Sequence, residues 1–279
     1  MSQTFLNHVI VCVMLWCVVG CNKPVPQAPS AVSSKPAAKK LSGEITISAA
    51  ASTKEAIEEI AKAYESKTGV KVKVNLGPSS SLANQILEGA PAQLFLSANR
   101  QWASKVEEAK LAKELSPLLT NDLVLVVPEG NPAGVKEPKD LASDAVKKIA
   151  LAGEKVPAGI YAEQVLKKLE LLDGLVNGGK IARGQDVRNT LQFVERGEAE
   201  AGIVYSTDVL AGSKVEVVHK FDKQLHDEIA YVLVLLNSSE NADAAKDFYE
   251  YLQSDEAQAV FSQHGFQKLT AATPAKENG

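Results

Sequence analysis

Apolar runs alternate with amphipathic stretches between residues 43 and 268 of this 279-residue chain. Continuous or alternating apolar positions predict strands, and apolar positions at i, i+3, i+4 and i+7 predict helices. The predicted strands are residues 45–48, 70–76, 94–97, 123–127, 149–152, 201–204, 215–218 and 229–235. The predicted helices are residues 56–64, 82–87, 101–109, 161–169, 187–196, 242–253 and 255–263. This alternation indicates an α/β fold with mainly parallel sheets flanked by helices.

Two predicted strands, residues 123–127 and 229–235, are long and uniformly apolar. Such runs are typical of strands buried within one sheet, and they also suit strands that cross between two lobes. The chain is long enough for one large domain or for two lobes with a substantial core. No internal repeat is evident.

The N-terminal segment is apolar and ends at a cysteine. Residues 1–20 contain no Lys, Arg, Asp or Glu, and the stretch from Val9 to Val19 is too short to span a bilayer as a permanent helix. It predicts a secretory signal and resembles a bacterial lipoprotein signal, in which Cys21 would be lipidated and become the first residue. It departs from that pattern in having His8 but no Lys or Arg near its start. An uncleaved anchor helix or a plain signal peptide is the alternative.

Residues 21–42 are rich in Pro, Ala, Ser and Lys and predict a flexible tether. Residues 271–279 are similarly polar and are expected to be disordered. Cleavage before Cys21 would leave one cysteine, capped by lipid, and no disulfide.

The composition narrows the class of function. With 45% apolar and 23% charged residues, the chain is typical of soluble globular proteins. A net charge of −4 argues against a nucleic-acid-binding protein, which usually carries a concentrated basic face. This net charge is compatible with a small-anion site, because local dipoles can outweigh a modest global charge.

Small and hydroxyl-bearing residues stand where predicted strands lead into helices. Ligands of open α/β sheets collect at these junctions, and the first turn of a helix offers unpaired N–H groups and the positive end of its dipole. The junctions are Ser52, Ser79-Ser80-Ser81, residues 156–161, Asp186-Val187-Arg188 and, after a strand, Tyr205. Each has an ordinary structural explanation, such as an N-cap at Ser52 or Asp186. Together they offer hydroxyl and N–H donors and require no cation at the contact point.

The ordered set of segments 49–52, 79–83, 89–92, 94–98, 156–162, 186–188 and 202–205 resembles the periplasmic molybdate-binding proteins of ABC importers. The resemblance covers about residues 43–268. It implies a two-lobed type II periplasmic-binding-protein fold, with the ligand in the cleft between the lobes. Lobe 1 would comprise residues 43–123 and 231–270, and lobe 2 residues 124–230. The two long apolar strands would be the crossing hinge strands.

The resemblance also implies a set of oxyanion-binding residues. Ser52 and Ser79 would donate through their hydroxyls and backbone N–H groups, Ala158 and Val187 through backbone N–H groups, and Tyr205 through its phenol. Ser52 could cap its helix and bind the ligand at once. The sequence departs from the family at two positions, Gln93 and Asn99, where family members often have Asp.

By the same resemblance, the protein would not be an enzyme and would need no cofactor. It would capture molybdate, and tungstate with it, and deliver the oxyanion to a membrane permease. It would act as a monomer outside the cytoplasm, held to the membrane by its N-terminal lipid.

Three alternatives remain open at the level of sequence. The nearest is a binding protein for another small oxyanion, such as sulfate or thiosulfate. A serine hydrolase is disfavoured because the chain has no Gly-x-Ser-x-Gly motif. A zinc or manganese site is disfavoured because His219 and His226 flank a charged stretch, where we expect surface residues, and no His-Glu-x-x-His motif occurs.

Overall fold

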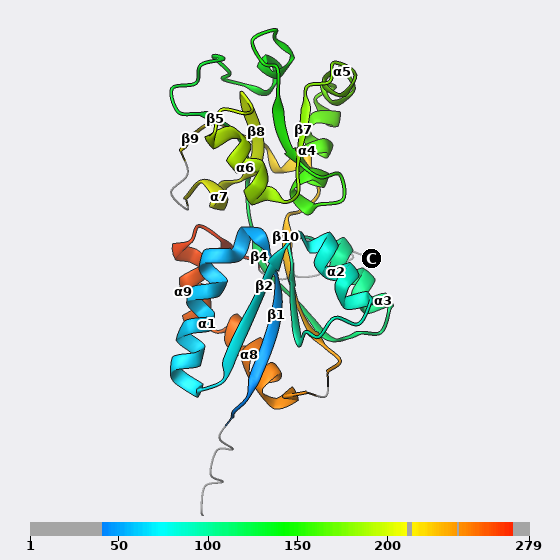
Figure 1. Ribbon diagram of the computed structural model, residues 1–279, viewed down its shortest axis with the longest axis vertical. Coiled ribbons are helices and arrows are strands. Elements are labelled where there is room, and N and C mark those ends of the chain that lie inside the picture. Colours follow the sequence, from blue (N-terminus) through cyan, green and yellow to red (C-terminus); the bar gives the residue numbers. More distant parts are fainter. Residues whose placement is uncertain (1–40, 211–213, 239, 270–279) are drawn as a thin grey trace, which may run out of the picture. The chain divides into compact units, whose positions relative to one another are not determined.

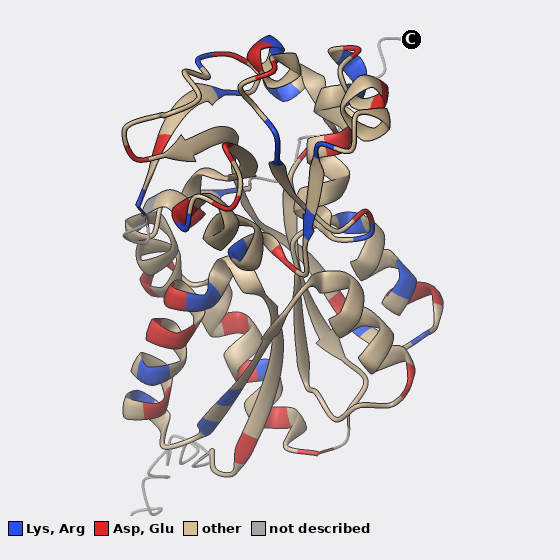
Figure 2. Ribbon diagram, turned by 45° about the horizontal axis from the view of Figure 1, so that its top comes forward, with Lys and Arg blue, Asp and Glu red and all other residues tan. Residues whose placement is uncertain are grey.

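Two β-sheets with flanking helices make up the part of the chain that the computed structural model describes, residues 41–210, 214–238 and 240–269 (Figure 1 and Figure 2). The predicted signal, Cys21, the tether up to residue 40 and the tail at 271–279 lie outside these residues. Leu41, which we assigned to the tether, is half-buried against the core. No helix within the described ranges is long and apolar enough to cross a membrane.

The first sheet has six strands in the order β11-β4-β10-β3-β1-β2. Its strands are β1 (Glu44–Ala50), β2 (Lys71–Gly77), β3 (Leu94–Ser97), β4 (Ala112–Thr120), β10 (Ala230–Leu236) and β11 (Gln267–Lys268). Its helical elements are η1 (Ala51–Thr53), α1 (Lys54–Thr68), α2 (Ser79–Leu87), α3 (Arg100–Glu108), α8 (Ala242–Gln253) and α9 (Asp255–Gln263). Helices α1, α8 and α9 share one apolar core, whereas α2 and α3 pack in a second core against β3 and β10 (Figure 1).

The second sheet has five strands in the order β7-β6-β8-β5-β9. Its strands are β5 (Leu123–Pro128), β6 (Ile149–Ala152), β7 (Ile181–Gly184), β8 (Ala201–Tyr205) and β9 (Val215–Lys220). Its helical elements are η2 (Pro138–Ala142), α4 (Pro157–Lys168), α5 (Leu172–Asn177), α6 (Val187–Glu195), α7 (Ser206–Leu210) and η3 (Lys223–Leu225). Below, lobe 1 and lobe 2 denote the parts built on the first and the second sheet.

The predicted α/β class is confirmed, and each predicted strand and helix is present. The sheets, however, are mixed rather than mainly parallel. Among the described strands, four pairings are parallel and five are antiparallel. The reason is that β5 and β10, the two long apolar strands, run antiparallel to their neighbours.

The chain crosses between the sheets at the starts of these two strands. It leaves β4 at Thr120 and enters β5 at Leu123, and it returns from η3 into β10 at Ala230. Each apolar strand therefore lies within one sheet, and the crossings precede them. At the first crossing, the Asp122 carboxylate accepts from Lys220 Nζ at 2.7 Å and from Gln267 Nε2 at 3.2 Å.

Candidate functional site

A small cavity lies where strand ends from both sheets face one another. All five predicted site residues line it: Ser52, Ser79, Ala158, Val187 and Tyr205. The rest of the lining is Ala50, Ala51, Gly77, Pro78, Ala98, Val156, Pro157 and Asp186. The cavity encloses about 220 Å³ of space outside the atoms, part of it open to solvent. The structure thus brings the predicted residues together, while their role in binding stays a prediction.

Three helices begin at this cavity. Ser79 and Val187 are the first residues of α2 and α6, and Ala158 is the second residue of α4. Backbone bonding within these helices begins farther along, with Ser81 N donating to Pro78 O and Ile160 N to Val156 O. The earlier N–H groups are left as donors, and the positive ends of three helix dipoles converge on one space.

Gly159 explains how α4 comes so close to the end of β6. A Cβ atom at this position would lie 2.3 Å from the carbonyl oxygen of Gly153 and 2.5 Å from that of Ala152. Only glycine allows this approach, which sets the first turn of α4 against the sheet.

The hydroxyl oxygen of Ser79 has a protein donor. Ala98 N donates to Ser79 Oγ at 2.9 Å, and both residues are buried. Because this bond uses the oxygen as an acceptor, the Ser79 proton is left to donate into the cavity.

The hydroxyl of Ser52 pairs with a residue that the sequence did not single out. Its Oγ lies 2.8 Å from the Tyr231 hydroxyl on β10, and Asn121 Nδ2 donates to the Tyr231 oxygen at 3.3 Å. Since Tyr231 accepts from Asn121, its own proton can go to Ser52, which frees the Ser52 proton for a ligand.

The interpretation of Ser52 as an N-cap was wrong. Ser52 is the middle residue of η1, whose cap position is Ala50, and α1 is preceded by Thr53. Neither cap position makes a side-chain capping bond. The extra turn places the Ser52 hydroxyl toward Tyr231 instead of toward its own helix.

Tyr205 carries a buried hydroxyl that has no hydrogen-bond partner among the described residues. The side chain is 1% exposed, at the end of β8. Burial raises the pKa of this phenol well above its usual value, so it stays protonated and acts as a donor. An unpartnered buried hydroxyl is destabilising, and a ligand that accepts a hydrogen bond in the cavity would remove this penalty.

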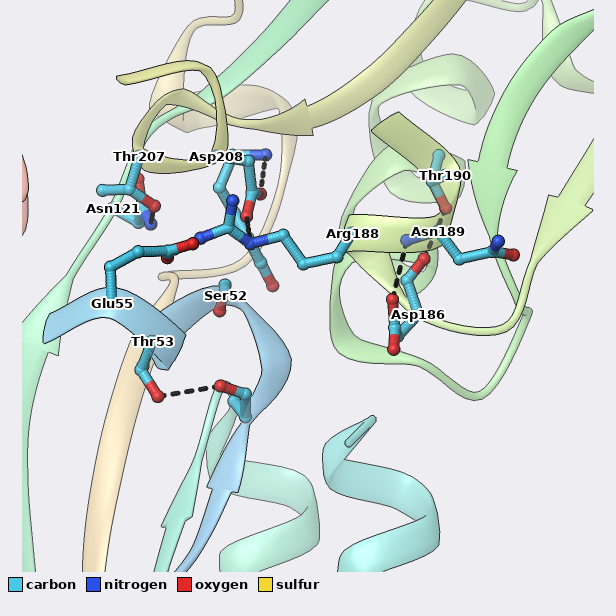
Figure 3. A network of polar contacts seen from close by, with 12 residues as sticks. Ser52, Thr53, Glu55, Asn121, Asp186, Arg188, Asn189, Thr190, Thr207 and Asp208 are labelled. Carbon is cyan, nitrogen blue, oxygen red and sulfur yellow. Dashed lines mark hydrogen bonds and ion pairs between the residues drawn. The ribbon is translucent and has the colours of Figure 1, made fainter. Parts of the chain in front are cut away.

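Asp186 is the one acidic residue of the cavity lining, and its carboxylate caps α6, as expected. Asp186 Oδ1 accepts from Asn189 N at 2.8 Å (Figure 3). The backbone carbonyl of Asp186 accepts from Thr190 Oγ1 at 2.7 Å.

An ion-pair network that the sequence did not reveal lies beside the cavity (Figure 3). The guanidinium of Arg188 pairs with Glu55 of α1 through Nη2, and its Nε lies 3.2 Å from Asp208 Oδ1. The other oxygen of Asp208 accepts from Tyr205 N at 3.1 Å. Burial raises the pKa of Asp208 to about 7, and the charge of Arg188 opposes this rise. In the sequence, Arg188 is notable only as a member of the junction at residues 186–188, next to Val187, and no pattern indicates its ion-pair partners.

Gln93 and Asn99, where the resemblance implied a departure from the family, do not line the cavity. Asn99 Oδ1 accepts from Trp102 N at 3.1 Å and caps α3. Gln93 Oε1 accepts from Thr46 N at 2.7 Å. Both positions therefore have structural roles that a neutral amide fulfils.

The described residues contain no group of three or more His, Cys, Asp or Glu that could hold a metal ion. The expectation that His226 lies on the surface was wrong. Its side chain is buried, with Nδ1 2.7 Å from the carbonyl oxygen of Asp227, and it packs edge-on against Tyr161.

Comparison with known proteins gives consistent matches over this part of the chain. The sequence profile of the bacterial extracellular solute-binding protein family matches residues 45–267. YvgL of Bacillus subtilis, named as a candidate ABC transporter substrate-binding lipoprotein, is 43% identical over 226 residues, covering 80% of this chain and 85% of YvgL. The molybdate-binding protein ModA of Haemophilus influenzae is 39% identical over 232 residues, covering 81% of this chain and 90% of ModA.

Solved structures match this chain over a similar share of its length. The substrate-binding domain of a candidate molybdenum ABC transporter from Clostridium difficile has a TM-score of 0.64 and 40% identity, covering 82% of this chain and all of that one. The sulfate-binding protein SubI of Mycobacterium tuberculosis has a TM-score of 0.70 at 20% identity, covering 82% of this chain and 88% of SubI. At that identity the second match shows a shared fold alone.

Proposed function

The chain belongs to the bacterial extracellular solute-binding protein family, in its ModA-like branch of ABC-transporter substrate-binding proteins, and from this premise we propose that it captures molybdate and tungstate for an importer. The proposed site is the cavity lined by Ser52, Ser79, Ala158, Val187 and Tyr205. The observation that carries the proposal is that this cavity offers hydrogen-bond donors, among them the unpartnered hydroxyl of Tyr205.

A cavity of donors fits a ligand that only accepts. Molybdate and tungstate are tetrahedral dianions without a proton at neutral pH, so each oxygen can accept hydrogen bonds and none donates. Phosphate at neutral pH still carries a proton and would require an acceptor. The one carboxylate of the lining, Asp186, already accepts from Asn189 N through Oδ1 and caps its own helix, so its role as a cap does not require a protonated ligand.

Neutral donors also suit a buried site. Placing Lys or Arg there would carry a desolvation penalty, whereas hydroxyls and the N-termini of α2, α4 and α6 supply positive potential without a full charge. We propose that Cys21, outside the described residues, carries the lipid that holds the protein at the outer side of the membrane.

Sulfate has the same charge and shape as molybdate but is smaller. A rigid ring of donors spaced for the longer metal–oxygen bonds would leave sulfate with fewer hydrogen bonds. Each lost bond to a charged group weakens binding by about 1.5–3 kcal/mol, so losing two would produce strong selectivity. Sulfate or thiosulfate binding is the second candidate function, and the shared fold with SubI is the observation that favours it.

Both lobes contribute to the proposed site, so lobe closure would assemble it. Two contacts already join the lobes beside the cavity. Trp102 Nε1 of α3 donates to the carbonyl oxygen of Lys155 at 3.0 Å, and Arg188 pairs with Glu55. Ligand binding would stabilise this closed arrangement, which a membrane permease could recognise as the loaded form.

Isothermal titration calorimetry of the purified protein with sodium molybdate and sodium sulfate tests the proposal. We expect saturable heat with molybdate at a one-to-one ratio and far weaker binding of sulfate. Absence of binding to molybdate, or equal affinity for the two anions, would overturn it.

A further inference from the structure

We propose that Arg188 is a positioning residue that couples lobe closure to the alignment of three donors in the oxyanion cavity. This inference rests on the proposed function. The guanidinium does not line the cavity, but it contacts two carboxylates whose own positions are tied to the cavity. Arg188 thus acts through its neighbours rather than on the ligand.

The first tie runs through α6 itself. Arg188 directly follows Val187, the residue whose backbone N–H is the proposed donor at the start of this helix. Any contact that fixes the Arg188 side chain therefore also restrains the first turn of α6.

The second tie crosses between the lobes. Nη2 of Arg188 pairs with Glu55, which lies in the first turn of α1, three residues after Ser52 (Figure 3). Ser52 belongs to lobe 1 and Val187 to lobe 2. The ion pair joins the two segments beside the cavity and is available only when the lobes are together.

The third tie passes through Asp208. Its Oδ1 lies 3.2 Å from Arg188 Nε, and its Oδ2 accepts from the backbone N–H of Tyr205 at 3.1 Å. Asp208 is fully buried, and the charge of Arg188 favours its ionised form against the opposing effect of burial on its pKa. The same guanidinium thereby fixes the end of β8 from which the Tyr205 hydroxyl reaches the cavity.

The two carboxylates have a further effect on the ligand. Glu55 and Asp208 offset the positive charge of Arg188, so the cavity is aligned by a cation without gaining a net positive charge from it. Donor geometry, rather than long-range attraction, then governs which dianion binds.

The variant Glu55→Gln is the sharpest test, because it removes the cross-lobe ion pair and leaves Arg188 with Asp208. Glu55 is 39% exposed, so the loss of its charge should not affect folding of lobe 1. Glu58→Gln, an exposed position on the same helix, is the matched control. Arg188→Lys keeps a charge beside Asp208 but loses the planar fork that reaches both carboxylates.

We expect Glu55→Gln and Arg188→Lys to weaken molybdate binding about three- to tenfold in calorimetry, mainly through faster dissociation. The melting temperature of ligand-free Glu55→Gln should match that of Glu58→Gln, and Glu58→Gln should bind as the wild type does. Equal molybdate affinity of both Gln variants would overturn the inference. So would a loss of affinity that simply follows a loss of ligand-free stability. A wild-type protein that binds no molybdate would instead refute the proposed function.

Discussion

The hydroxyl of Tyr231 lies 2.8 Å from Ser52 Oγ, behind the cavity rather than in its lining. Tyr231 is fully buried, and burial raises the pKa of its phenol, so it remains a donor. Because Asn121 Nδ2 donates to the same phenol oxygen, a chain of hydrogen bonds runs from the crossing between the lobes to a proposed ligand-binding hydroxyl. This chain orients the Ser52 proton toward the cavity.

Tyr231→Phe therefore tests whether orientation of Ser52 matters for binding. Removing the Tyr231 hydroxyl leaves the Ser52 hydroxyl free to rotate and deprives Asn121 of an acceptor. We therefore expect molybdate affinity to fall about fivefold and the free energy of unfolding to fall by about 1–2 kcal/mol. Calorimetry and urea denaturation would measure the two effects. Unchanged affinity, with the stability loss present, would show that the Ser52 hydroxyl is not oriented by Tyr231.

Tyr205→Phe removes one proposed donor without opening a void. Since the Tyr205 hydroxyl has no partner in the described structure, ligand-free stability should stay the same or rise slightly. Molybdate affinity should fall about 10- to 100-fold, as expected for a lost hydrogen bond of about 1.5–3 kcal/mol to a charged ligand. If titration gives wild-type affinity, Tyr205 is not part of the site.

Val187→Pro deletes a single backbone donor. Val187 is the first residue of α6, where proline is tolerated, and Asp186 before it is extended, with φ −145° and ψ −177°. Val187→Ala is the matched control, because it also loses side-chain packing but keeps the N–H. We expect the proline variant to bind molybdate at least tenfold more weakly than the alanine variant. Equal binding by the two variants would exclude this N–H from the site.

Trp102 should report closure of the lobes. Its indole N–H reaches Lys155 O across the cleft at 3.0 Å, and Lys105 Nζ lies 4.0 Å from its ring centroid. The chain holds only one other tryptophan, Trp16. Molybdate should change the tryptophan emission of the wild type, and Trp102→Phe should abolish that change. A ligand-induced change that persists in Trp102→Phe would contradict this.

Asp208 should give the stability of the protein a specific pH dependence. Burial raises its pKa from 3.8 to about 7, so between about pH 4 and pH 7 the folded state binds more protons at this site than the unfolded chain does. This group alone makes stability fall as pH rises through that window. Urea denaturation at several pH values should show that Asp208→Asn removes this component. The same pH slope in both proteins would argue against the raised pKa.

The sequence predicted the strongly periodic elements well and missed those with mixed patterns. Strand β4 was not predicted because charged residues and Pro117 interrupt its apolar pattern, and its pairing with β10 shifts register there. The short edge strand β7 contains Arg183 and Gly184, which weaken its signal. Both strands form because a neighbouring strand supplies the hydrogen bonds, which local sequence does not encode.

The residues of the site also fall into two groups, those that the sequence predicted and those that it did not. Residues at strand-to-helix junctions could be predicted, because strand ends and helix N-termini have local sequence signals. The contacts of Arg188 with Glu55 and of Tyr231 with Ser52 join positions 133 and 179 residues apart. No local pattern predicts such pairs, so the residues that hold the donors in place emerged only from the structure.

Binding of molybdate in competition with other tetrahedral anions tests the central claim most directly. Purified protein would be dialysed to equilibrium against molybdate, alone or with a large excess of sulfate, phosphate or tungstate, and bound molybdenum measured by elemental analysis. The proposed molybdate site predicts one bound molybdenum per chain, displaced by tungstate and retained against sulfate and phosphate. Displacement by sulfate at comparable concentration, or no bound molybdenum, would contradict it.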